Sequence, residues 1–151
     1  MTVLVTGGSG LVGSHVIAEL RAAGIPVRAL VREPARGVVQ ALGAEAVVGD
    51  VTDPRAWARA GEGVDAIVHA AALVAQPVAF ERFVDVNVGG TRLAVETAQA
   101  RGAHLVHISS VAVYGRGAAA GAGHPVDEEF PFQPLAEPDF YARTKRMAEA
   151  V

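Results

Sequence analysis

Cysteine is absent from this chain of 151 residues, so it can form neither a disulfide nor a thiolate metal site. This absence is consistent with a cytoplasmic protein, which is the location we expect. Lysine is nearly absent as well, because twelve of the thirteen strong bases are arginine. The one lysine, Lys145, stands four residues after Tyr141, one of only two tyrosines. Because the chain otherwise uses arginine, the single lysine indicates that an ammonium group is needed at this position beside the tyrosine.

Clusters of basic residues are also lacking. The net charge is −3 and the arginines are scattered singly, so no surface for nucleic acid is predicted. Residues 1–18 carry no Lys, Arg, Asp or Glu, but four glycines interrupt this stretch and no basic residue precedes it. Neither a signal peptide nor a membrane span has this pattern. We therefore expect a soluble protein that binds no nucleic acid and no membrane.

Short runs rich in β-branched residues alternate with longer helical stretches along the chain. This alternation is typical of βαβ units with right-handed crossovers and of a parallel sheet covered by helices on both faces. The sequence predicts an α/β fold with a doubly wound, Rossmann-type sheet of about five strands in the order 3-2-1-4-5. Strands are expected at 2–6, 27–31, 46–49, 65–71 and 104–110, and helices at 11–23, 35–42, 54–60, 79–101 and from about 139.

The extent of the predicted domain is the whole chain, residues 1–151. A doubly wound dinucleotide fold usually has six strands, and the helix that begins near 139 reaches Val151 without a C-cap signal. We therefore expect an N-terminal portion whose C-terminal, substrate-binding part is absent. Residues 115–137 are rich in glycine and proline and are predicted to form a loop.

Three glycines at three-residue spacing follow the first predicted strand in "TGGSGLVG". Gly7 supplies the backbone freedom for a sharp turn, Gly10 lets a diphosphate approach, and Gly13 lets the helix pack closely on the sheet. Leu11 and Val12 complete the turn at the helix N-terminus, where unpaired N–H groups favour an anion. A purely structural turn is the alternative, but the βαβ context favours nucleotide binding.

The ends of the second and third strands bear on cofactor choice. An acidic residue after the second strand would bind the ribose 2′-hydroxyl of NAD, but the chain has Arg32 there. Arginine suits a 2′-phosphate, which favours NADP over NAD, although a solvated surface arginine is the alternative. Asp50 and Val51 follow the third strand, where they could meet the adenine. A turn or cap role for Asp50 is equally compatible with its position.

Six stretches together identify a family resemblance. In their order and spacing they resemble the N-terminal portion of extended short-chain dehydrogenases/reductases, the NAD(P)-dependent epimerase/dehydratase family. The stretches are "VLVTGGSGLVGSHV" at 3–16, "GDVTD" at 49–53, "VDAIVHAAA" at 64–72, "VNVGGTRLAVETA" at 86–98, "ISSVAVYG" at 108–115 and "YARTK" at 141–145.

The resemblance implies roles for single residues. Tyr141 matches the catalytic tyrosine, Lys145 its partner lysine, and Ser110 the serine that binds the reacting carbonyl or hydroxyl. Residues four apart share one helix face, so the tyrosine and the lysine should project side by side. A phenol is a poor base at neutral pH, but a nearby ammonium stabilises the phenolate. A surface Tyr–Lys pair is the alternative when these two residues are taken alone.

Further matches and one departure refine the resemblance. Ala70 and Ala71 match the stretch that lies along the cofactor diphosphate and ribose, and Asn87 matches an asparagine that helps to organise the site. In the sugar-nucleotide dehydratases of the family, acidic residues that eliminate water follow the serine. Val111 and Ala112 stand there in this chain, which disfavours the dehydratase branch.

Two classes of function follow. The first is an NAD(P)-dependent enzyme, a reductase or a sugar-nucleotide epimerase, that transfers hydride at a secondary alcohol or ketone of a small molecule. The second is a non-catalytic dinucleotide-binding module or an inactive fragment of such an enzyme. A longer form is expected to form a homodimer through the helices at 79–101 and from 139. No metal site is predicted, since His104 and His107 lie on opposite faces of a strand, where core or surface positions explain them.

Overall fold

The computed structural model describes residues 1–115 and 127–151 of the chain. Five parallel strands form one sheet in the order β3-β2-β1-β4-β5, which confirms the predicted fold class and strand order. The last residues of β1, β4 and β5 are paired in register and lie side by side. The strands are β1 (Val3–Thr6), β2 (Val27–Val31), β3 (Glu45–Val48), β4 (Ala66–His69) and β5 (His104–His107).

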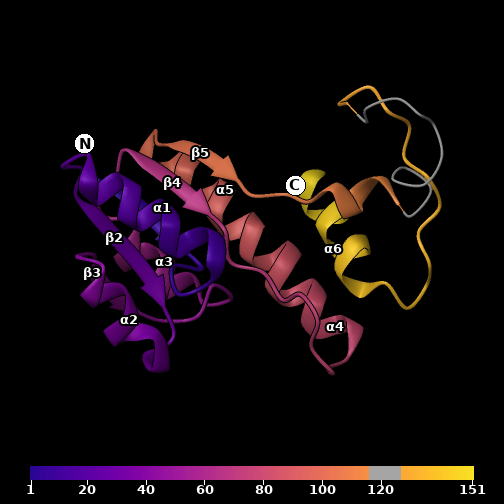
Figure 1. Cartoon of the computed structure of the whole chain (residues 1–151), viewed down its shortest axis with the longest axis horizontal. Coiled ribbons are helices and arrows are strands. Elements are labelled where there is room, and N and C mark those ends of the chain that lie inside the picture. The colour runs from indigo at the N-terminus through magenta and orange to yellow at the C-terminus, as the bar shows by residue number, and fades with distance from the viewer. Residues whose placement is uncertain (116–126) are drawn as a thin grey trace.

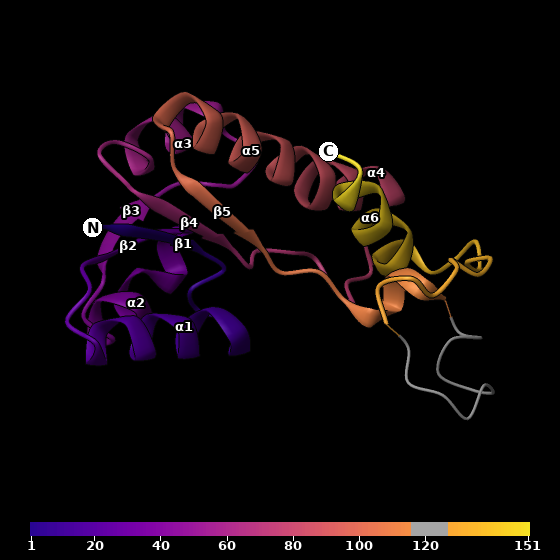
Figure 2. The ribbon, with the colours of Figure 1, turned by 90° about the horizontal axis from the view of Figure 1, so that it is seen from above.

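Helices cover both faces of this sheet (Figure 2). One face packs on α1 (Leu11–Ala22) and α2 (Arg36–Ala41), and the other on α3 (Pro54–Ala60) and α5 (Gly90–Arg101). Neighbouring residues of β1 enter opposite cores, as the two-residue period of a strand requires. Val5 packs with Ile17 of α1, whereas Leu4 packs with Trp57 of α3. All of β1 is therefore buried, as its uninterrupted apolar run predicts.

The predicted helix at 79–101 is continuous but changes its winding. It begins as α4 (Phe80–Phe83), widens into a π-helical segment, η2 (Val84–Gly89), and continues as α5. Nothing in the local sequence predicted this change, because a π-turn depends on packing that extends beyond the helix. Such segments are rare and often occur at functional sites. The widened turn contains Asn87, one of the residues singled out above.

The last helix, α6 (Phe140–Glu149), lies beyond the carboxyl ends of the strands (Figure 1). Asp139 caps it by accepting a backbone N–H of its first turn. The Phe140 ring packs against Phe80 and Phe83, with ring centroids 5.2 and 5.7 Å apart. Aromatic contacts therefore join α6 to α4.

Two strands are shorter than predicted. The sequence predicts strands at 65–71 and 104–110, whereas β4 ends at His69 and β5 at His107. The reason lies in the neighbouring strand. The chain turns away after Thr6 of β1, so β4 has no partner there past His69, and β5 in turn loses its pairing with β4. Apolar composition alone does not reveal where a neighbouring strand ends.

Two connecting segments show how the elements are joined. Asp53 caps α3 by accepting the Arg55 N–H at 2.9 Å. The predicted loop at 115–137 is confirmed for residues 127–137, which contain neither helix nor strand. Residues 116–126 lie outside the described residues. Within the described part of the chain, no helix is both long and apolar enough to cross a membrane.

Asn87 joins three segments of the chain. Its side chain is 1% exposed. The Oδ1 atom accepts the Leu73 N–H at 2.7 Å, and Nδ2 donates to the Leu73 carbonyl at 3.0 Å and to Thr144 Oγ1 at 2.9 Å. One buried amide thereby links the segment after β4, the π-turn and α6.

Replacing Asn87 with alanine should destabilise the fold by about 2–4 kcal/mol, because two buried backbone groups lose their partners and a cavity is left. Urea unfolding followed by circular dichroism measures this change. The control is Gln99→Ala at an exposed position of α5, which should change stability by less than about 0.5 kcal/mol. Equal stability of the two variants would show that the amide is not a structural link.

Candidate functional site

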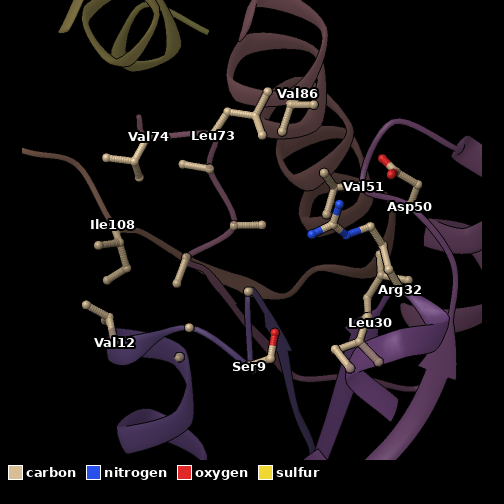
Figure 3. Close-up of a pocket in the computed structure, with 18 of the residues that line it drawn as sticks. Ser9, Val12, Leu30, Arg32, Asp50, Val51, Leu73, Val74, Val86 and Ile108 are labelled. Carbon is tan, nitrogen blue, oxygen red and sulfur yellow. The ribbon is translucent and has the colours of Figure 1, made fainter. Parts of the chain in front are cut away.

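A cleft of about 480 Å³ opens at the carboxyl ends of the strands. Its walls come from the glycine turn after β1, the ends of β2 and β3, and the segment after β4 (Figure 3). The helix around η2, the segment after β5 and α6 also contribute lining residues. In open α/β sheets, ligands bind in a crevice at this edge, where the strand order reverses.

Two glycines of the turn are required by the fold itself. Gly7 has φ +69°, and a Cβ there would lie 2.7 Å from backbone atoms of Ala70 and Ala71. A Cβ on Gly13 would lie 2.2 Å from the Gly7 carbonyl oxygen, so Gly13 lets α1 pack closely against the turn that directly follows β1. Gly10 is different, because its Cβ would approach only the Gly7 oxygen, at 3.3 Å. Gly10 is exposed and lines the cleft, as expected of a residue that a ligand approaches.

The N-terminus of α1 faces the same cleft. Gly10 is its N-cap and provides no side-chain hydrogen bond, and the first turn of α1 contains no acidic residue. Leu11 and Val12 line the cleft and are 80% and 47% exposed. The first N–H groups of α1 and the positive end of its dipole therefore have no anionic partner within the helix. This arrangement fits a dinucleotide diphosphate.

Charged residues gather at the ends of β2 and β3. Arg32, Asp50 and Val51 line the cleft there (Figure 3). Asp50 accepts the Thr52 N–H at 3.0 Å and the Thr52 hydroxyl at 2.9 Å, so it also stabilises a turn. Burial alone would raise the pKa of the Asp50 carboxyl, but these hydrogen bonds and the charges of Arg82 and Arg32 hold it below its ordinary value. Arg82 Nη2 lies 3.7 Å from Asp50 Oδ2.

Tyr141 and Lys145 both line the cleft from α6, as their spacing predicts. The Lys145 side chain is 2% exposed. Its Nζ donates to the Ile108 carbonyl at 2.6 Å and lies 3.0 Å from His107 Nε2. Burial lowers the pKa of Lys145 to about 8, and the charge of Glu149 opposes this shift. Among the hydrogen bonds of the described residues, none joins this ammonium to the tyrosine hydroxyl.

Two of the proposed site residues do not line the cleft. Ser110 precedes a short 3₁₀ turn (Val111–Tyr114) and caps it by accepting a backbone N–H at 3.2 Å. Asn87 is buried behind Leu73, whose backbone it holds. The neighbouring serine, Ser109, lines the cleft in place of Ser110. The two predicted residues therefore lie close to the cleft wall without forming it.

Some lining residues were not singled out in the sequence analysis. They project from the segment after β4, from the helix that follows, and from the end of β5. The sequence motifs already contained Val86 and Ile108, and a helical projection from Val86 leads to Arg82 one turn earlier. His107 was assigned a core or surface position, but it contacts Lys145. The unpredicted lining residues include Leu73, Val74, Arg82, Val86, Ile108 and Ser109.

Comparison with known proteins identifies the family. Residues 3–151 match the model of the NAD dependent epimerase/dehydratase family. The chain belongs to this family. It is 39% identical over 153 residues to a 4-hydroxy-2-methyl-3-oxo-4-farnesyl-3,4-dihydroquinoline-1-oxide ketoreductase of Stigmatella aurantiaca, with 99% of this chain and 44% of that protein covered. It is 34% identical over 167 residues to UDP-glucose 4-epimerase 4 of Oryza sativa subsp. japonica, covering 99% and 43%.

A solved structure supports the same assignment. A short-chain dehydrogenase/reductase superfamily protein from Agrobacterium tumefaciens, crystallised with bound NAD, superposes with a TM-score of 0.84 at 35% identity. The match covers 99% of this chain and 43% of that one. The chain thus spans less than half the length of the relatives it matches.

Alanine at Gly10 and alanine at Gly13 should have different consequences. Gly13→Ala should destabilise the fold by about 3 kcal/mol, because the methyl group meets a backbone oxygen that cannot move away. Gly10→Ala should cost less than about 1 kcal/mol but weaken NADP⁺ binding at least about tenfold, because the methyl group fills space above the helix N-terminus. Thermal unfolding and calorimetric titration measure the two effects. Unchanged affinity in a folded Gly10→Ala variant would exclude binding at this turn.

Proposed function

We propose that this chain forms the nucleotide-binding part of an NAD(P)-dependent enzyme that transfers hydride at a secondary alcohol or ketone of a small molecule. The observation that carries the proposal is the convergence on one cleft of the glycine turn, the free N-terminus of α1, Tyr141 and Lys145. Membership of the family and the ketoreductase and epimerase names of two relatives support it.

Each side chain has a distinct part in the proposed reaction. When bound, the nicotinamide supplies the chemistry of hydride acceptance or donation. Tyr141 takes the hydroxyl proton in oxidation and returns a proton to the oxygen in reduction. The positive charge of Lys145 favours the phenolate that oxidation requires. Ser110 donates a hydrogen bond to the reacting oxygen. Its hydroxyl must first rotate away from the backbone N–H of the 3₁₀ turn that it caps here.

Reductase and epimerase activities use this same step. A reductase leaves the hydride on its substrate, whereas an epimerase removes it and returns it to the opposite face of the same carbon. Val111 and Ala112 supply no carboxylate beside Ser110, so we do not propose dehydration. A nucleotide sugar, as the name of the rice relative suggests, is one class of substrate. A cytoplasmic location and a homodimer through α5 and α6 stay predictions from the sequence.

A non-catalytic dinucleotide-binding module is the second candidate. Two observations favour it. The Lys145 ammonium is held by the end of β5 and not by the tyrosine hydroxyl, and Ser110 does not line the cleft. A module of this kind would bind the nucleotide without turnover, and the replacement of the tyrosine distinguishes the two candidates.

Tyr141→Phe should lower turnover at least about a hundredfold, because the acid–base group is removed. The variant is made in the protein that the gene encodes, and nicotinamide absorbance is followed with a panel of keto substrates and UDP-glucose. Affinity for NADP⁺ should change by less than about threefold, since the ring remains. The matched control is Tyr114→Phe, at the other tyrosine, whose ring packs on Phe130 and Phe132. Full turnover in Tyr141→Phe would favour another mechanism, and no turnover in the parent protein would favour the module.

We further propose that NADP is the preferred cofactor, with Arg32 binding its 2′-phosphate. Arg32→Ala should weaken NADPH binding at least about tenfold and change NADH binding by less than about twofold. The control is Arg36→Ala, whose guanidinium lies 3.8 Å from Glu33 and away from the cleft lining. Fluorescence titration measures all four affinities. Equal losses for both nucleotides would favour NAD, which the Agrobacterium structure contains.

A further inference from the structure

Three polar residues form a row across the sheet at the carboxyl ends of its strands. Thr6, His69 and His107 are the last residues of β1, β4 and β5, and the register of the strands places them side by side. Residues paired in this way project to the same face of a sheet. His69 Nδ1 lies 2.8 Å from the Thr6 hydroxyl, and the rings of the two histidines stack with centroids 5.7 Å apart. Apolar side chains would be expected in such a row between the sheet and its helices.

The contact with Lys145 fixes the direction of one hydrogen bond. An ammonium has three donors and no acceptor, so His107 Nε2, 3.0 Å from Lys145 Nζ, must accept. A neutral imidazole that accepts at Nε2 carries its proton on Nδ1. Within the described residues, His107 Nδ1 is buried and has no partner. The tautomer with its proton on Nδ1 is therefore inferred from the contact with Lys145 alone, since the ring makes no other hydrogen bond with the described residues.

The pKa values of the groups in and around the row agree with a hydrogen bond donated by Lys145 to His107. Burial and the Lys145 charge lower the pKa of His107 to about 4, against an opposing effect of Glu149. Burial, His107 and Lys145 lower the pKa of His69 to about 3. Both imidazoles are therefore neutral at pH 7, whereas Lys145, with a pKa of about 8, remains mostly charged. A charged donor thus faces a neutral acceptor.

We propose that His107 is a positioning residue for Lys145, whose ammonium it holds at the base of the cleft together with the Ile108 carbonyl. An apolar side chain at this position would leave a second donor of the buried ammonium unpaired. His107 and the Ile108 carbonyl contact the ammonium from the side of the sheet. Hydroxyls of a bound ribose would therefore accept from its remaining donor or draw the lysine away from these two partners. The role in the reaction rests on the proposed function, but the hydrogen bond itself does not.

The first test is the tautomer of His107. Long-range ¹H–¹⁵N NMR of the 151-residue chain at pH 7 distinguishes protonation at Nδ1 from protonation at Nε2, and His107→Gln assigns the signal. We expect a proton on Nδ1. In Lys145→Met the pKa of His107 should rise, because the neighbouring positive charge is removed. A proton on Nε2 in the parent chain would overturn the proposal whether or not any variant folds.

The second test uses the single lysine. A chain labelled with ¹³Cε-lysine gives one side-chain signal, whose titration reports the pKa of Lys145 directly. His107→Leu should lower this pKa by about one, because the ammonium loses an acceptor, whereas His107→Gln, which retains an acceptor, should change it by less than about 0.3. His104→Leu, on the exposed face of the same strand, is the matched control and should leave the pKa unchanged. An unchanged pKa in a folded His107→Leu variant would overturn the proposal.

Addition of NADP⁺ separates this inference from the proposed function. If the nucleotide binds, the lysine signal should shift, and His107→Leu should alter the size of that shift. Binding without any shift would overturn the role of His107 in the reaction. If NADP⁺ does not bind at all, the proposed function fails, while the tautomer and the lysine titration still decide whether His107 positions the ammonium.

Discussion

The contact between Gly13 and the carbonyl oxygen of Gly7 is the constraint on which the site depends. The two residues approach so closely that no side chain fits between them. This contact folds the chain from β1 directly into α1 and directs the first turn of that helix toward the cleft. Gly7 in turn lies against the backbone of Ala70, which sets how the segment after β4 leaves the sheet. The cleft lies between the segments whose paths these two close contacts fix.

A second group of contacts positions α6, which lies beyond the carboxyl ends of the strands. Thr144 accepts from Asn87, and Lys145 donates to the Ile108 carbonyl. Arg146 donates to the Val113 carbonyl at 2.7 Å. Three consecutive side chains of α6 therefore make directional polar contacts with segments far away in the sequence. Because hydrogen bonds tolerate little change in distance or angle, they determine the position of Tyr141 more closely than apolar packing would.

The order of the strands could be predicted because its signals are local. Alternating strand and helix patterns and the glycine turn act within a few residues of their own positions. The predictions that needed revision depend on distant neighbours. The end of β4 is set by the turn after β1. The π-turn contacts one segment that precedes it in the sequence and one that follows it, through the hydrogen bonds of Asn87.

The residues of the candidate site also fall into those that local sequence could predict and those that depend on distant neighbours. The residues singled out at the glycine turn and at the ends of β2 and β3 line one cleft, since each directly follows its strand. The partner of Lys145 did not follow from the sequence, because His107 stands 38 positions away from it. Ser110 was assigned through family resemblance, and resemblance does not specify which hydrogen bond its hydroxyl makes in a given state.

The burial of Lys145 has a practical consequence. It is the only lysine of the chain and is 2% exposed in the folded state, so reagents that acylate side-chain amines find none at the surface. Modification of this one residue requires α6 to separate from the sheet, and its rate therefore reports how often that local opening occurs. The single lysine thus serves as a chemical probe of the local stability of α6.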